Sequence, residues 1–436
     1  MKGKKEEIFQ LALPAAVENI LHALVGFVDT WMISKIGLIA VTAVGMANNL
    51  MMVYLAVFTA LGTGTSSLIA RSIGAGKKEK TKEFFIQSTV LAILSGAVFG
   101  IATLLLGGKV LEIMGAEGEV LREGKLFLYV VGSASVFISL LTSLAAVIRA
   151  SGDTKRPMIV NTLVNIFNVG IDYILIFGWG FIPPLGVLGT AIGTVISRAL
   201  GCFFMFQVLK KKGLSLSLKE IYTNTNYKEL IFLSISAALE RLVMRLGQVL
   251  YYSLIAMIGI KTYAAHVIAG NIESFFYMPA YGLSTAAAIL MGNCFGRKDK
   301  EEGLEYLKSI IGISIIIAVI SGMILYLFGT KAAFVFTEDL EAVAKITTAL
   351  RVDAFAQIPL ALGIVFTGAL QGIGDTKTPL YSTIIGVWGL RVVGIYVMGM
   401  VLGMDILGVW LAIAFDLTIR AAILFIRLRK EFRGIL

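Results

Sequence analysis

Charged residues are scarce in this sequence of 436 residues. Asp, Glu, Lys and Arg together make up 15% of the chain, whereas soluble domains carry roughly 25%. Hydrophobic residues make up 57%, and the mean hydropathy is +0.87. Proline is also scarce, with 7 residues, while glycine is abundant, with 46, as in membrane helices that pack closely. The apolar runs are continuous rather than alternating, so the sequence predicts membrane helices and not a closed barrel.

Motifs that would power or catalyse a reaction are absent. The sequence contains no Walker A, HExxH or G-x-S-x-G pattern, and the GAGKK segment at 74–78 lacks the spacing of a phosphate loop. Cys202 and Cys294 lie inside or at the ends of apolar runs, where they read as small packed residues and not as a disulfide framework or metal site. We therefore expect no enzyme and no cofactor, and any transport by this chain would have to be driven by an ion gradient, of Na⁺ or H⁺.

The net charge of +10 does not predict nucleic-acid binding, because the basic residues form neither one face nor an arm. They gather in alternate short loops, which is the positive-inside pattern of membrane proteins. We therefore expect a multi-pass protein of the inner (plasma) membrane, with both termini cytoplasmic. The predicted spans lie near 8–33, 41–70, 84–107, 124–148, 158–178, 186–208, 229–257, 264–292, 308–329, 343–369, 379–403 and 406–427.

The chain repeats itself at an offset of about 222 residues. The segment IRASGDTKRPM at 148–158 matches LQGIGDTKTPL at 370–380. Single residues repeat at the same offset: Glu18 with Glu240, Gly37 with Gly259, Asn49 with Asn271, Gly186 with Gly408, and Arg198 with Arg420. The repeat predicts an all-α membrane protein of about twelve helices in two pseudo-symmetric six-helix lobes, with the axis along the membrane normal. The lobes are expected at 1–212 and 228–436, joined by a cytoplasmic linker at 213–227.

Ionisable residues inside the predicted spans are candidates for function, because each costs several kcal/mol at membrane depth. In the first lobe, one helical face holds Glu18, His22 and Asp29. The fifth span carries a polar stripe of Asn161, Asn165, Asn168 and Asp172 at spacings of three and four. Carboxylate and amide oxygens suit a hard cation such as Na⁺, and the same carboxylates can instead carry a proton. The alternative is that these polar groups only hold helices together.

The second lobe does not repeat this pattern. Tyr251 stands at the repeat of Asp29, and Gly394 stands at the repeat of Asp172. Glu240 is followed by Arg241 and Arg245, which favours internal ion pairing over ion coupling. His266 and Glu273, seven residues apart on one helical face, either line a cavity or join helices, and Tyr277 belongs to an aromatic and Met-rich set of candidate substrate contacts.

Five segments in order resemble the multidrug and toxic compound extrusion (MATE) antiporters. They are VDTWMISKIG at 28–37, GTGTSSLIARSIGAG at 62–76, RASGDTKRP at 149–157 with its repeat LQGIGDTKTP at 370–379, NVGIDYILIFG at 168–178, and FYMPAYGLSTAAAILMGNCFG at 276–296. The resemblance covers essentially the whole chain. It implies two six-helix lobes that rock between inward- and outward-facing states and export cationic or amphipathic compounds in exchange for Na⁺ or H⁺.

The resemblance also implies a cation site in the first lobe. The residue types of that site stand here as Asp29, Asn168, Asp172 and Thr190. Other branches of the family carry acidic ion-coupling residues in the seventh and tenth helices, where Arg245 and Leu360 stand here. The expected partners are membrane lipid and small organic cations or amphipathic drugs, for a protein that acts as a monomer. The alternative function is a flippase for a lipid-linked saccharide, which Arg241, Arg245 and Arg391 keep open.

Overall fold

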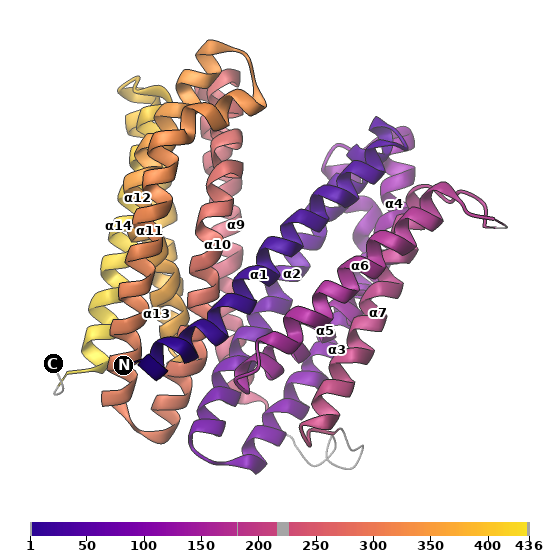
Figure 1. Cartoon of the computed structure of the whole chain (residues 1–436). Helices are drawn as coiled ribbons and strands as arrows, with labels where there is room; N and C mark the ends of the chain where they lie inside the picture. Colours follow the sequence, from indigo (N-terminus) through magenta and orange to yellow (C-terminus); the bar gives the residue numbers. More distant parts are fainter. Residues whose placement is uncertain (1, 181, 216–225, 434–436) are drawn as a thin grey trace. The chain divides into compact units, whose positions relative to one another are not determined.

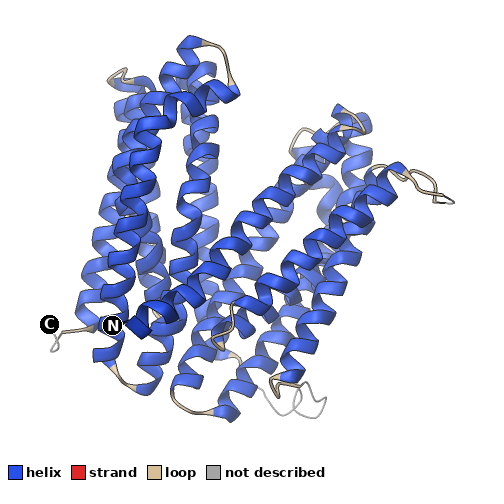
Figure 2. Ribbon diagram, viewed as in Figure 1, coloured by secondary structure: helices blue, strands red, loops and turns tan. Residues whose placement is uncertain are grey.

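The computed structural model describes residues 2–180, 182–215 and 226–433, and these residues are almost entirely helical (Figures 1 and 2). An isolated bridge pairs Trp179 with Ile182 in the loop after the fifth predicted span. Most of the predicted linker at 213–227 lies outside the described residues.

The helices follow the predicted apolar runs. Their bounds are α1 (Lys2–Ser34), α2 (Leu38–Gly74), α3 (Lys78–Ile113), α4 (Gly118–Ser133), α5 (Ser135–Ala150), α6 (Lys155–Phe177), α7 (Val187–Lys211), α9 (Lys228–Ile258), α10 (Ile260–Arg297), α11 (Lys300–Phe336), α12 (Leu340–Ile373), α13 (Lys377–Thr383), the π-helical η1 (Ile384–Val392) and η2 (Ile395–Val401), and α14 (Asp405–Glu431).

Among the described residues, ten helices are long and apolar enough to cross a membrane. The α4 and α5 helices pass the same test together, with a bend of 47° between them, and so add one broken span. The α9 helix is 31 residues long and carries Glu240, Arg241 and Arg245. The predicted all-helical membrane fold is therefore confirmed.

Packing divides the chain into two compact units. The N-unit consists of Val17–Ile73 and Lys77–Ala238, and the C-unit consists of Met1–Ala16, Gly74–Gly76 and Leu239–Leu436. This division falls within α1, after Ala16, and within α9, after Ala238. The predicted lobe boundaries at 212 and 228 are not tested by it and stay a prediction.

The first half of α1 packs with the C-unit because of a close approach at Gly282 of α10. A Cβ atom at Gly282 would lie 2.4 Å from the carbonyl oxygen of Ala12 and 2.9 Å from the Cβ of Ala16. Only a residue without a side chain admits the α1 backbone at this distance. Ion pairing between Lys4 and Glu305 ties the start of α1 to α11 in the same unit.

The sequence repeat is also a repeat of helix contacts. In each unit, small residues let two helices approach closely at positions about 222 residues apart. The matching contacts are Gly62–Ala146 with Ser284–Gly368, Gly107–Leu128 with Gly329–Leu350, and Gly100–Ser133 with Gly322–Ala354. The two halves therefore have helix contacts at the same positions of the repeat. At one of them the glycine lies on the other helix of the pair, since Gly62–Ala146 repeats as Ser284–Gly368.

The aspartate of each repeated GDT motif joins two helices of its own unit. Asp153 accepts a hydrogen bond from the backbone N–H of Arg156 (3.1 Å) and pairs with Lys212 at the end of α7 (3.1 Å). Asp375 accepts a hydrogen bond from the backbone N–H three residues further on (3.0 Å) and pairs with Arg427 of α14 (2.8 Å). The motif is thus a helix cap that also anchors the last helix of the unit.

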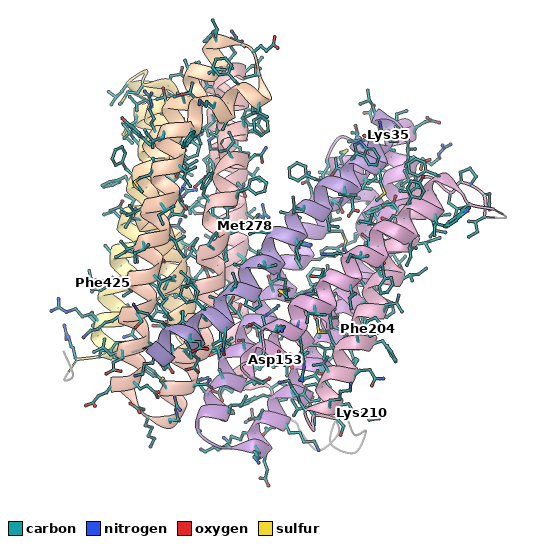
Figure 3. All side chains as sticks on the ribbon, in the orientation of Figure 1. Lys35, Asp153, Phe204, Lys210, Met278 and Phe425 are labelled. Atoms are coloured by element: carbon teal, nitrogen blue, oxygen red, sulfur yellow. The ribbon has the colours of Figure 1, made fainter. Side chains whose placement is uncertain are left out.

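The ends of the N-unit differ in their basic residues. Figure 3 places Lys35 at one end of this unit and Asp153 and Lys210 toward the other. The end with Lys210 also carries Lys211 and Lys212, and its predicted cytoplasmic location stays a prediction.

We predict that Gly372→Ala destabilises the C-unit. Its Cβ atom would lie 2.3 Å from the carbonyl oxygen of Ala288 on α10, so α12 and α10 must separate, at a cost of about 1–3 kcal/mol. The matched control is Gly363→Ala on the same helix, whose Cβ atom would have its nearest neighbour at 4.0 Å, the Cβ of Ala421. Thermal unfolding of the purified variants should show a lower midpoint for Gly372→Ala alone, and equal midpoints would contradict the prediction.

Candidate cation-binding site

The four residues of the predicted cation site all lie in the N-unit. Asp172 and Asn168 are on α6, Thr190 is in the first turn of α7, and Asp29 is in the last third of α1 (Figure 1). Asp172 is 0% exposed, Thr190 4% and Asn168 8%, while Asp29 is half-buried. The α6 and α7 helices are direct neighbours joined by a short loop.

The Asp172 carboxyl group lies directly against the backbone of α7. A Cβ atom at Gly193 would lie 1.9 Å from Asp172 Oδ1 and 3.1 Å from its carboxyl carbon. Gly189, one turn earlier, approaches α6 in the same way, with its Cβ position 2.6 Å from the carbonyl oxygen of Leu175. Two glycines on one face of α7 thus make room for the carboxylate between the helices.

Polar atoms of all four predicted residues are buried without a hydrogen-bond partner. They are Asp29 Oδ1, Asn168 Nδ2, Asp172 Oδ1 and Oδ2, and Thr190 Oγ1. Each such atom costs about 1–3 kcal/mol if it stays unsatisfied, so native proteins seldom leave several together. The unpartnered oxygens of Asp29, Asp172 and Thr190 suit a hard cation such as Na⁺, and a proton on one carboxylate suits them as well, whereas the unpartnered atom of Asn168 is an N–H donor.

Charge in the site is not balanced. Asp29 of α1 and Arg198 of α7 are both close enough to Asp172 to act on it electrostatically, and Arg198 also acts on Asp29. Two carboxylates therefore face one guanidinium, and Arg198 NH1 itself has no hydrogen-bond partner. A single bound cation or proton would make the cluster neutral.

A metal ion of the transition series is not indicated. Among the described residues, no group of three or more His, Cys, Asp or Glu side chains is placed to hold a metal ion. Any cation at Asp29 and Asp172 would need neutral oxygen ligands to complete its shell, and the roles predicted for Asn168 and Thr190 as such ligands stay predictions.

Glu18 belongs to a separate polar cluster. It pairs with Arg149 (3.0 Å) and accepts a hydrogen bond from Asn161 Nδ2 (2.6 Å). The C-unit repeats this arrangement, because Glu240 accepts a hydrogen bond from Gln371 Nε2 (3.2 Å) at the same offset along the chain. Glu18 and Glu240 therefore connect a long helix to the segment before each GDT motif.

Other predicted candidates lie apart from the four. His22 is exposed and Asn165 is half-buried. Tyr277 is half-buried and packs edge-on against Tyr281 in the C-unit (5.7 Å between ring centroids). The substrate contacts predicted for these residues stay predictions.

The ion pairing predicted for the charged residues of α9 stays a prediction. Arg245 donates a hydrogen bond to Gln248 Oε1 (3.0 Å). Glu240 accepts a hydrogen bond from Gln371 Nε2, and Arg241 acts on it electrostatically.

His266 is buried among aromatic rings. Its ring lies 5.1 Å from that of Tyr252, 5.6 Å from Trp410 and 6.1 Å from Tyr251. Tyr251, at the repeat of Asp29, lies under the guanidinium of Arg391 at 5.3 Å. Glu273, seven residues after His266, lies near Asp353 of α12 and acts electrostatically on Tyr251 of this cluster.

Sequence reasoning missed two contributors to the N-unit site. In the sequence, Arg198 was noted only because Arg420 repeats it at the offset of 222 residues. That repetition was the one sequence feature that could have pointed to its role. Gly193 had no signal of its own, because its role depends on how closely α7 approaches Asp172.

Taken together, the repeated helical units, the spans of membrane length and the uncompensated buried carboxylates define a membrane transporter. The profile of the MatE family matches residues 14–174 and 236–397. A relative named probable multidrug resistance protein NorM, from Thermotoga maritima, is 30% identical over 96% of this chain and 91% of its own length. The chain therefore belongs to the MatE family of transporters, and it is not an enzyme.

Further relatives and solved structures agree with this assignment. The uncharacterized transporter YisQ of Bacillus subtilis is 26% identical over 98% of this chain and 95% of its own length. A multidrug resistance MATE family transporter solved in an outward-facing conformation shares the fold with a TM-score of 0.88 at 24% identity, over 98% of this chain and 96% of that one. A transporter from Pyrococcus furiosus gives a TM-score of 0.87 at 24% identity, over the same shares of the two chains.

We predict that Gly193→Ala impairs the cation site without unfolding the protein. The new methyl group would displace the Asp172 carboxylate, which lies 1.9 Å from its position, so transport driven by a cation gradient should fall at least tenfold, equivalent to about 1.4 kcal/mol. The matched control is Gly170→Ala on α6, where nothing lies within 4 Å of the added atom. Efflux from proteoliposomes measures both variants, and wild-type rates in Gly193→Ala would contradict this placement of Asp172.

Proposed function

We propose that this protein is a secondary antiporter that exports cationic or amphipathic organic compounds across the plasma membrane in exchange for Na⁺ or H⁺. The coupling ion binds in the N-unit to Asp29 and Asp172, with Asn168 and Thr190 as neutral oxygen ligands. The protein acts as a monomer, surrounded by membrane lipid, with both termini on the cytoplasmic side.

The observation that carries the proposal is the set of unpartnered buried oxygens on Asp29, Asp172 and Thr190. Asp29 and Asp172 act on one another electrostatically, and with Arg198 as their shared guanidinium they lack one positive charge. A site that is neutral only when a cation is bound is occupied to a different extent on the two sides of a membrane with an ion gradient. This property is what an ion-coupled transporter requires, because a ligand shifts a conformational equilibrium by its differential affinity for the two states.

For a neutral amphipathic substrate, the coupling energy is sufficient for efflux. One elementary charge moving down a potential of 100 mV releases about 2.3 kcal/mol, whereas a tenfold concentration gradient of a neutral substrate requires about 1.4 kcal/mol. A single cation at Asp172 therefore supports such a gradient of a neutral substrate. In the proposed cycle, the cation binds from outside, the substrate leaves, and the neutralised site favours the return to the inward-facing state.

The substrate class follows from the relatives and from the surface of α1. Several relatives are named multidrug resistance proteins. Beside Asp29, the side chains of Phe27 and Trp31 are 63% and 57% exposed, and aromatic faces of this kind bind organic cations. We assign export of such compounds to this chain on these grounds.

The pairing of Arg391 disfavours the alternative function as a flippase. A pyrophosphate group needs free cationic side chains, but Arg391 pairs with Asp416 at 2.7 Å. Arg245 is partly engaged by Gln248 at 3.0 Å.

Export driven by an imposed ion gradient tests the proposal. Purified protein in liposomes loaded with a fluorescent organic cation should export it when either a Na⁺ gradient or a pH gradient is imposed. Drive by Na⁺ alone would assign the site to a metal cation, and drive by pH alone would assign it to a proton. Absence of efflux under both gradients would overturn the proposal, and lipid-linked substrates would then be tried.

We predict that Asp29→Asn abolishes coupled efflux and leaves the protein folded. The substitution keeps the shape of the side chain but removes one of the two negative charges, so the site with Arg198 is neutral without a cation. Efflux assays and thermal unfolding measure the two effects separately. The control is Glu119→Gln, which removes an exposed carboxylate of α4 that pairs with Arg122 at 3.5 Å, and wild-type transport by Asp29→Asn would refute the assignment.

A further inference from the structure

A cavity lies at one end of the N-unit, beside Ile36 and next to the residue that Figure 3 labels Lys35. Its volume is 650 Å³, within the range of about 300–1,000 Å³ that small-molecule sites occupy. The lining residues come from the turn between α1 and α2, from the first two turns of α4 and from the chain that leads into α7, all of them in the N-unit. The cavity is therefore large enough for an organic molecule, and one unit builds it.

The walls of the cavity combine apolar and acidic side chains. The aliphatic part includes Ile36, Leu38 and Leu185, of which Leu38 is 86% exposed. The acidic part consists of Glu119 and Glu123, and none of the described residues that line the cavity is basic. Such a surface is complementary to a ligand that has an apolar body and a positive charge.

Glu123 is the more sheltered of the two carboxylates. Its side chain is 24% exposed, whereas the side chain of Glu119 is 63% exposed. Both carboxylates pair with Arg122, Glu123 at 3.1 Å and Glu119 at 3.5 Å, but Arg122 is itself 69% exposed and does not line the cavity. Ion pairs in such exposed positions are weak, so Glu123 keeps most of its negative charge at the cavity.

The C-unit has an ammonium group where the N-unit has Glu123. The α10 and α12 helices begin 222 residues after α2 and α4, so the register of the repeat is secure in this region. Lys345 stands at the repeat of Glu123. Its ammonium group pairs with Asp405 and donates a hydrogen bond to Thr262 Oγ1 at 3.0 Å. The same position of the fold thus holds a cation in one unit and a carboxylate in the other.

Lys261 gives the C-unit a second ammonium group near this position. It pairs with Glu341 at 2.6 Å and with Asp339 at 3.0 Å. Its repeat in the N-unit is Ile39, which lines the cavity. The N-unit therefore lacks both ammonium groups that the C-unit carries at matching positions, while the carboxylate of Glu123 lines the cavity. An ammonium group brought by a ligand would supply the missing positive charge.

We propose that this cavity binds amphipathic organic compounds that carry an ammonium group. The ammonium group lies at Glu123, and the apolar part of the compound packs against Ile36, Leu38 and Leu185. The ligand is a free compound and not a phospholipid headgroup, because the described lining residues offer no basic side chain to hold a phosphate group. The site uses neither carboxylate of the proposed cation site, so it is a second site beside the one for the coupling ion.

Binding of dansylcadaverine to the purified full-length protein tests this proposal. This dye joins an apolar fluorophore to a primary ammonium group through an alkyl chain, much as a lysine side chain carries its ammonium group, and its fluorescence rises in apolar surroundings. The protein is titrated in a neutral detergent without an ion gradient, so that coupled transport does not contribute. A dansyl compound with an uncharged alkyl chain is the control ligand, and short-chain phosphatidylethanolamine is the competitor that represents a lipid headgroup.

Three variants separate the cavity from general surface charge. Glu123→Gln removes the sheltered carboxylate, and Glu123→Lys introduces the residue type that the C-unit has at this position. The matched control is Glu119→Gln, one turn earlier on α4, which removes an equal charge paired with the same Arg122 but largely exposed to water. Thermal unfolding shows whether each variant is folded.

Wild type should have one saturable dye site that the uncharged compound does not fill. Glu123→Gln should weaken this site at least about tenfold, because the ligand loses a charge-assisted hydrogen bond, and Glu123→Lys should abolish it. Glu119→Gln should weaken it less than about twofold. Wild-type affinity in Glu123→Lys, or equal losses in Glu119→Gln and Glu123→Gln, would overturn the proposal.

Two further outcomes concern the location and the ligand. Asp172→Asn should keep the dye site, and its loss in that variant would place the dye at the cation site and overturn the proposal. Displacement of the dye by phosphatidylethanolamine would assign the cavity to a lipid headgroup and overturn the choice of a free compound. Failure of coupled efflux in wild type, with the dye site present and sensitive to Glu123→Gln, would contradict the proposed antiport and still support the cavity.

Discussion

Charge neutrality at membrane depth is the constraint on which the arrangement of this protein depends. A carboxylate buried between helices costs several kcal/mol unless it is paired. Glu18 meets the requirement with Arg149, and Asp416 meets it twice, with Arg391 and Arg420. Asp29 and Asp172 both lie near Arg198, and we propose that a mobile cation balances the remaining charge of this cluster. In this proposal the unbalanced site serves transport, whereas the balanced pairs hold the helices together.

The two units keep a common skeleton and differ in chemistry. Both use small residues at the same close contacts, both anchor their last helix through the aspartate of the GDT motif, and both tie a glutamate to the residue four positions before that aspartate. At the positions of Asp29 and Asp172, the C-unit instead has Tyr251 and Gly394. The segment that repeats α6 is wound as the π-helical η1 and η2, and η1 carries Arg391 into the buried pair with Asp416. The two units thus share their helix contacts, whereas their buried charged residues differ.

Much of this could be predicted from the sequence, because hydropathy and an internal repeat are strong signals. The stripe of Asn168 and Asp172 followed from helical spacing, whereas Thr190 entered only through resemblance to a family. Helical spacing placed Glu18 and Asp29 on one face of α1, but it could not show that Arg149, 131 residues away, takes Glu18 out of the site. The contribution of Gly193 depends on an interhelical distance, which the sequence does not show. Spacing within a helix is readable from sequence, and pairing between distant helices is not.

The central claim is that the N-unit site is incomplete without a cation. The direct measurement is equilibrium binding to the purified protein, with radioactive sodium and proton release followed in the same sample, for wild type and for Asp172→Asn. The account predicts that wild type binds one of the two cations at a site that Asp172→Asn loses, because Asp29 and Arg198 then balance each other. Unchanged uptake of sodium and unchanged proton release in Asp172→Asn would contradict it.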